Sequence, residues 1–164
     1  MNVVTFVVWG VAQTAGSKRG FYNKKLGRVI ITDDNAKSRP WKAQVTDAAA
    51  AVMAGRPLLE GALSAAFVFY LPRPKSHHGR RGLLPSAPAF PVVKPDALKL
   101  ARAVEDALTG VVYRDDSQIV YESLWKAYGK PCVEITVAEL SPGAATGIAA
   151  PGLFDEMPML EGAQ

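Results

Sequence analysis

The segment between residues 72 and 93 sets the strongest constraint on how this chain folds. It contains five prolines and two glycines. Proline fixes one backbone torsion and donates no backbone hydrogen bond, so neither a regular helix nor a central strand can run through this stretch. We therefore expect a long, mobile loop here, with separate sets of regular elements before and after it.

Before this loop, the residue pattern predicts three strands and one helix. Residues 3–12 and 62–71 are rich in β-branched and aromatic residues, as strands are, and residues 29–32 form a shorter strand. The sequence Ser-Arg-Pro-Trp at 38–41 marks a helix start, because proline is favoured in the first turn. This helix should end near Gly55.

After the loop, the pattern predicts a second helix and two more strands. The helix opens at Asp96, which can cap it, and its apolar residues repeat at the spacing of one buried face: Leu100, Ala103, Val104, Ala107 and Leu108. Residues 111–120 enter a strand, and residues 119–127 and 132–140 are expected to pair antiparallel. The predicted fold is an α+β domain with a small mixed or antiparallel sheet and two principal helices.

The domain is expected to span residues 1–140, followed by a weakly ordered tail over 141–164 that is rich in Gly, Ala and Pro. Leu153 and Phe154 in this tail either dock a partner or pack on the body of the domain. No run of about 18 apolar residues occurs, and the start lacks the features of a secretory signal. We therefore expect a cytoplasmic protein without a membrane span.

Basic residues cluster in two segments, residues 18–42 and 73–102. Together these hold 15 of the 19 Lys and Arg residues against three Asp. Such clustering indicates a polyanionic partner, most often nucleic acid, although charge alone fits ordinary solvated loops equally well. The candidate DNA contacts are Lys18, Arg19, Lys24, Lys25, Arg73, Lys75, Arg80, Arg81, Lys94 and Lys99.

Two adjacent aspartates, Asp115 and Asp116, lie in the strand-like run, where neighbouring negative charges are costly. Adjacent strand residues point to opposite faces, so a second carboxylate for one site must come from elsewhere, and Asp96 is the best candidate. Converging carboxylates fit Mg²⁺, and with basic loops they indicate metal-assisted hydrolysis of a phosphodiester. The spacing fits the alternative, a turn at the aspartate pair and a mere helix cap at Asp96, at least as well.

The sequence of residues 94–120, KPDALKLARAVEDALTGVVYRDDSQIV, resembles the signature of RusA-type Holliday-junction resolvases, which are common in phages and prophages. In that family, a helix start Asp-x-Asp-Asn-hydrophobic-x-Lys precedes Asp-Ala-Leu and then an Asp-Asp-x-Gln-hydrophobic-Val strand. Residues 106–108 and 115–120 match the last two motifs closely. The early strand, the Pro-Trp helix and the segment before the signature extend the resemblance over residues 3–140.

The resemblance implies a homodimeric, Mg²⁺-dependent endonuclease that cuts branched DNA, preferentially four-way junctions. It implies metal binding by Asp96, Asp115 and Asp116, with Asp116 the stronger candidate of the strand pair. Arg102 takes the position of the family's catalytic lysine. An arginine stays protonated, so it can stabilise the charge on a phosphorane but cannot act as a general acid.

The chain departs from the family at Leu98, where the helix-start motif has its second aspartate, and Lys99 stands in place of the asparagine. Leu98 falls on the polar face of the predicted helix with Arg102 and Glu105, and a leucine cannot ligate a metal. Either the site works with fewer carboxylates, helped by Glu105 from two turns along the helix, or the chain binds junctions without cutting them. A third alternative is an unrelated small α+β domain with basic loops.

Overall fold

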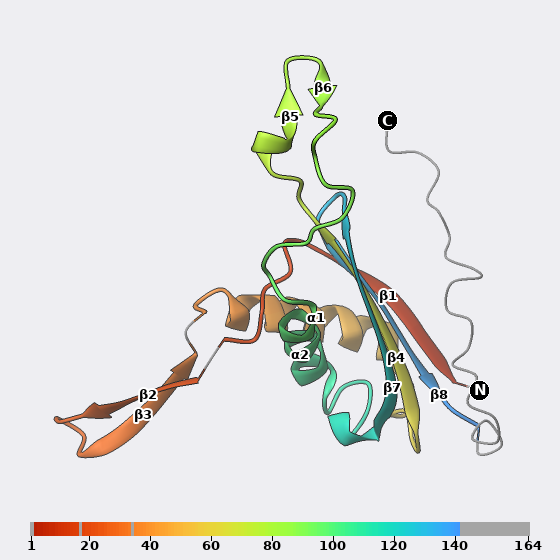
Figure 1. Ribbon diagram of the computed structural model, residues 1–164. Helices are drawn as coiled ribbons and strands as arrows, with labels where there is room; N and C mark the ends of the chain where they lie inside the picture. Colours follow the sequence, from red (N-terminus) through yellow and green to blue (C-terminus); the bar gives the residue numbers. More distant parts are fainter. Residues whose placement is uncertain (1, 17, 34, 142–164) are drawn as a thin grey trace.

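The protein is described by a computed structural model that covers residues 2–16, 18–33 and 35–141. Two helices, α1 (Ser38–Met53) and α2 (Ala97–Leu108), cover one face of a four-stranded mixed sheet, as Figure 1 shows. The strand order is β1–β8–β4–β7. The bounds of these strands are Val3–Trp9 for β1, Leu63–Leu71 for β4, Ile119–Tyr128 for β7 and Cys132–Glu139 for β8. The predicted α+β class with two principal helices is confirmed.

The core lies between the helices and this sheet. Every second residue of β4 is buried, from Leu63 to Leu71, and the same alternation buries one face of β1. The predicted apolar stripe of α2 is buried throughout. On α1, the buried positions recur at the spacing of a helix face that includes Trp41 and Val45. Burial of these two helix faces fixes α2 against the sheet.

The last two strands do not pair with each other, so the prediction of an antiparallel β7–β8 pair was wrong. β4 lies between them, parallel to β7 and antiparallel to β8. The connection crosses the end of β4 at Gly129, whose N–H donates to the Leu71 carbonyl at 3.0 Å. A Cβ on Gly129 would lie 2.9 Å from the Tyr70 ring, so glycine lets the chain pass there.

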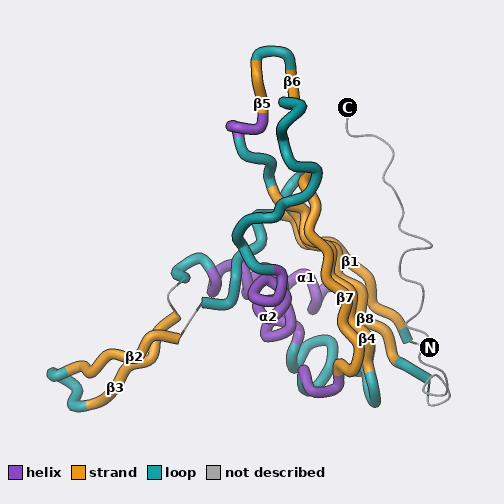
Figure 2. The backbone as a smooth tube through the Cα atoms, in the orientation of Figure 1, coloured by secondary structure: helices purple, strands orange, loops and turns teal. Residues whose placement is uncertain are grey.

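Two hairpins stand outside the main sheet (Figure 2). β3 (Arg28–Asp33) covers the predicted short strand, but its partner β2 (Lys18–Asn23) was not predicted. In the proline-rich segment, a 3₁₀ turn, η1 (Lys75–His77), leads into a hairpin of β5 (His78–Gly79) and β6 (Gly82–Leu83). The expectation of no regular element there was wrong for this part, because residues 75–84 contain no proline.

None of the helices in the described ranges is long and apolar enough to cross a membrane. Leu153 and Phe154, the predicted docking residues of the tail, lie outside the described residues.

Candidate active site

Asp96 occupies the N-cap position of α2 and is exposed. Its backbone carbonyl accepts a hydrogen bond from the Leu100 N–H at 3.1 Å. Its side chain caps no helical N–H, contrary to the predicted cap, because the carboxylate is drawn toward Lys99, whose Nζ lies 3.8 Å away. The carboxylate is thus not used by the helix start.

A cleft of about 560 Å³ opens at this helix start. Its walls come from the segment after β1, the end of β4 and the proline-rich segment, and its charged lining residues are Lys94, Asp96 and Lys99. The N–H of Ala15 donates to the Lys99 carbonyl at 2.9 Å and ties the first wall to α2. An open cleft with two ammonium groups and one carboxylate has the charges needed to meet a phosphodiester.

Lys126 on β7 holds the chain that leads into α2. Its ammonium donates to the Val93 carbonyl at 3.0 Å and to the Pro95 carbonyl at 2.9 Å. These two bonds fix the residues directly before Asp96. No sequence motif predicts this role; the one signal is a lysine in an otherwise apolar and aromatic part of a strand.

We expect Lys126→Met to lower the free energy of unfolding by about 1.5–3 kcal/mol, because hydrogen bonds from a charged donor are lost and two carbonyls lose their partner. Urea denaturation measures the change. Lys75→Met, at an exposed position on η1, is the matched control and should change stability by less than about 0.5 kcal/mol. Equal losses in the two variants would contradict the role of Lys126.

Asp115 and Asp116 lie in a capped turn and not in a strand. The 3₁₀ turn η2 (Asp116–Gln118) directly precedes β7. Oδ1 of Asp115 accepts from the Ser117 N–H at 3.0 Å, while Oε1 of Gln118 accepts from the Asp115 N–H at 3.1 Å. Hydrogen bonds from the side chain and then from the backbone N–H of Ser117 lower the pKa of Asp115. The predicted strand was wrong here because this reciprocal capping outweighs strand pairing.

The charge of Asp116 acts on Glu105 of α2, which in turn pairs with Glu122 of β7. The carboxyls of Glu105 on α2 and Glu122 on β7 are within hydrogen-bonding reach of each other. Burial first, and then the neighbouring Glu122 and Asp116, raise the pKa of Glu105 to about 7. Oε1 of Glu122 is buried without a hydrogen-bond partner. Two ionised carboxylates can only accept hydrogen bonds, so either a proton or a cation must lie between them.

The helix α2 separates this acidic cluster, Glu105, Asp116 and Glu122, from Asp96. Glu105 is nine positions after Asp96, which corresponds to about 13 Å along the helix axis. Leu98 and Arg102 lie between them on the exposed face, and Leu98 is 72% exposed. Within the described ranges, no group of three or more His, Cys, Asp or Glu side chains has the geometry of a metal site. Electrostatics link Asp116 to Glu105 and Glu105 to Glu122, but these carboxylates are not arranged as a metal site.

Glu105 makes stability depend on pH. Its pKa is raised from 4.5 to about 7 on folding, so the folded chain keeps a proton that the unfolded chain has lost, and stability falls as the pH rises through this window. In EDTA, we expect Glu105→Gln to melt at a higher temperature than the wild type at pH 8, with the difference disappearing toward pH 4.5. A difference in melting temperature that does not change with pH would contradict this.

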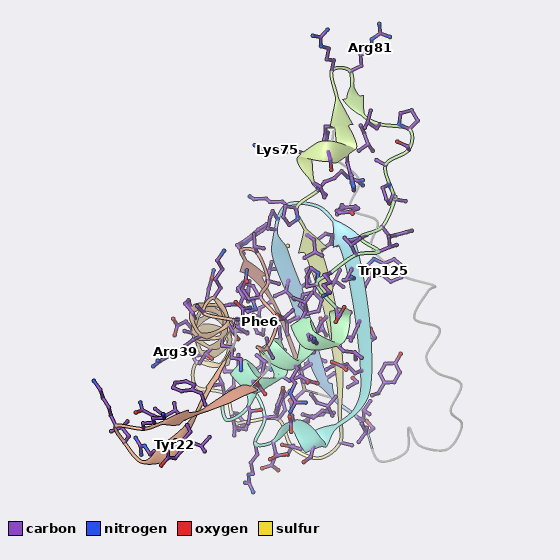
Figure 3. All side chains as sticks on the ribbon, turned by 60° about the vertical axis from the view of Figure 1, so that its left-hand side comes forward. Phe6, Tyr22, Arg39, Lys75, Arg81 and Trp125 are labelled. Carbon is purple, nitrogen blue, oxygen red and sulfur yellow. The ribbon has the colours of Figure 1, made fainter. Side chains whose placement is uncertain are left out.

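Most of the predicted DNA contacts are exposed and lie on projecting parts of the fold. The turn of the β2–β3 hairpin carries two, the β5–β6 turn carries two more, and Figure 3 shows Arg81 at the tip of the latter. The side chains of Lys18 and Arg19, on β2, lie outside the described part. The predicted DNA contacts that are exposed are Lys24, Lys25, Lys75, Arg80, Arg81, Lys94 and Lys99.

Arg73 differs from the other basic residues, because it is half-buried and holds the proline-rich segment. Its guanidinium lies 4.0 Å from the centre of the Tyr128 ring and donates to the Pro88 carbonyl at 2.8 Å. Further along, Phe90 packs edge-on against Trp125, with 5.7 Å between ring centres. Both contacts attach the segment to β7, so the base of the β5–β6 hairpin is fixed.

Comparisons with known proteins cover most of the chain, including both ends of the candidate site. A family model described as endodeoxyribonuclease RusA matches residues 12–138, which include the cleft, α2 and η2. The chain is also similar to the uncharacterized protein YqaN of Bacillus subtilis (strain 168). The two are 32% identical over 152 residues, which cover 86% of this chain and 99% of that protein.

Proposed function

Because this chain belongs to the endodeoxyribonuclease RusA family, we propose that it is a Mg²⁺-dependent endonuclease that cuts four-way DNA junctions in recombination, repair or phage DNA processing. The observation that carries the proposal is the position of Asp116 in the turn η2, directly before β7, where its charge acts on Glu105 of α2. The proposed domain is residues 1–140. Docking of a partner through Leu153 and Phe154 stays a prediction.

The acidic cluster supplies oxygen ligands for a divalent cation, but its carboxylates would have to move together, because within the described ranges they do not have the geometry of a metal site. Mg²⁺ prefers carboxylate oxygens, and the buried Oε1 of Glu122 has no hydrogen-bond partner. Asp116 is the proposed central ligand. Asp96 and Asp115 remain proposed ligands on the resemblance alone, and Asp96 lies at the other end of α2 from Glu105. A bound Mg²⁺ would polarise the phosphodiester and acidify a water molecule.

The residues of this chain position the DNA and stabilise charge. Arg102 is exposed on the face of α2 between Asp96 and Glu105, where its permanent positive charge would stabilise the phosphorane. Lys94 and Lys99 would bind the DNA backbone at the cleft, and the basic hairpins would hold the arms of the junction. A symmetric homodimer is proposed because a four-way junction needs two paired cuts.

The direct test uses a synthetic four-way junction and a linear duplex of the same sequence. The wild type should nick the junction in Mg²⁺, leave the duplex intact and show no cleavage in EDTA, and junction binding should weaken steeply as salt rises. Cleavage in EDTA would contradict the metal dependence. Equal cleavage of the duplex would contradict the selectivity for junctions.

A second candidate function is junction binding without cleavage. The observation that favours it is Leu98, a 72% exposed leucine at the position where the family motif has a carboxylate. This candidate predicts salt-sensitive junction binding, a dimer in sedimentation, and no nicking by the wild type in Mg²⁺.

A further inference from the structure

The β2–β3 hairpin is the part of the fold that neither the core nor the proposed active site uses. It forms its own two-stranded sheet, and none of its described side chains belongs to the buried core. Figure 1 shows it clear of the main sheet and the helices, and Figure 3 shows Tyr22 on it far from Phe6 of the core face. An isolated hairpin is at best marginally stable in water, so a partner for its surface is expected.

This hairpin exposes large apolar side chains among positive charges. Four such side chains are each about half exposed or more: Phe21, Tyr22, Leu26 and Val29. The exposed basic residues beside them are Lys24, Lys25 and Arg28. Between positions 20 and 32 the sequence has no acidic residue. Cations that meet phosphates, together with aromatic rings that stack on bases, are the combination that binds unpaired nucleic acid.

The two rings lie on opposite faces of the hairpin. Phe21 and Tyr22 are neighbours on β2, and adjacent strand residues point to opposite sides. The strand register places Phe21 opposite Ile30, and Tyr22 opposite Val29. Each face therefore carries one ring beside a β-branched residue. A thin element of this kind can enter between two stacks of bases and place one ring against each stack.

We propose that the β2–β3 hairpin is a wedge that enters the branch point of a DNA junction and stacks Tyr22 and Phe21 on the unstacked bases there. This inference rests on the junction-cutting function proposed above. A linear duplex offers no unstacked base, so the rings add to junction selectivity and not to general affinity. A second copy of this chain is a less suitable occupant, because the hairpin is basic and the chain carries a net charge of +4.

The test places the fluorescent base 2-aminopurine at the branch point of a synthetic junction, where stacking on a ring quenches its emission. We expect Tyr22→Leu, which keeps an apolar side chain but removes the ring, to weaken junction binding about tenfold and to lose the quenching. Tyr22→Trp should restore both, and duplex affinity should stay unchanged. Trp9→Ala removes a 54% exposed ring outside the hairpin and is the matched control, with no change expected.

The contrary outcomes distinguish failure of the wedge from failure of the proposed function. An equal loss of junction and duplex binding in Tyr22→Leu would overturn the wedge and leave a plain backbone contact. A dimer that dissociates in Tyr22→Leu would overturn it in favour of a second copy. If the wild type prefers junctions and Tyr22→Leu behaves identically, the wedge alone fails; if the wild type shows no preference, the proposed function fails too. Circular dichroism checks that each variant is folded.

Discussion

Asp116→Asn is expected to abolish nicking of a four-way junction, with the rate falling at least about a hundredfold. Asparagine keeps the size of the side chain but removes the charge that attracts the cation, and a catalytic metal supplies several kcal/mol of transition-state stabilisation. Single-turnover cleavage at saturating protein measures the loss. Junction affinity in EDTA should not fall, since the substitution removes a negative charge from the DNA-binding surface.

Two variants separate this effect from general changes in charge and in the turn. Asp47→Asn, at an exposed position of α1, makes the same chemical change elsewhere and should leave cleavage unaltered. Asp115→Asn keeps Oδ1, the atom that accepts from the Ser117 N–H at 3.0 Å, so the turn should persist while the charge is lost. Full cleavage by Asp116→Asn would remove the proposed metal site. Full cleavage by Asp115→Asn would assign Asp115 to the turn alone.

Leu98→Asp is expected to raise the rate of junction nicking about tenfold or more, or to create nicking if the wild type has none. The new carboxylate lies on the exposed face of α2 between Asp96 and Arg102, where the family motif has an aspartate. A gain of one ligand that contributes about 1.4 kcal/mol to the transition state corresponds to that factor. Nicking assays over a range of Mg²⁺ concentration measure the rate and the metal affinity together.

The fold should tolerate this substitution. Leu98 is 72% exposed, so little packing is lost, and the first turn of α2 contains no acidic residue. A negative charge near a helix N-terminus stabilises the helix by about 0.3–1 kcal/mol. Leu98→Asn, which is polar but uncharged, is the matched control and should not raise the rate. A rate that falls in Leu98→Asp but not in Leu98→Asn would show that negative charge at this position hinders DNA binding.

Local patterns predicted the elements of this fold better than their arrangement. The stripe from Leu100 to Leu108 repeats at the helical spacing, so sequence alone is enough to place α2 and its buried face. The connection from β7 to β8 is only three residues long, which favours a hairpin of these two strands. Their actual pairing depends instead on β4, which takes the position between them in the sheet. Passage over β4 requires the close approach of Gly129 to Tyr70, which no local pattern shows.

The candidate site was predictable in part for the same reason. The motif drew attention to Asp116 and Asp96, but a period-two pattern cannot distinguish a strand from a capped turn. Side-chain bonds between Asp115, Ser117 and Gln118 decided between them. Glu105 and Glu122 come from α2 and β7, which are brought together only by the fold. No sequence pattern indicates Glu122, whereas Glu105 shares a predicted helix face with Leu98.

The strand β7 sets the distance between the two ends of the candidate site. Its first residue, Ile119, directly follows η2, and Lys126 near its other end holds the carbonyls that precede Asp96. Lys126 is seven positions after Ile119, a span of about 23 Å in an extended strand. Insertions in the proline-rich segment would change how far the β5–β6 hairpin extends, but not this span. On the proposed function, the distance between the two ends that DNA would contact is therefore set by the sheet and not by loop length.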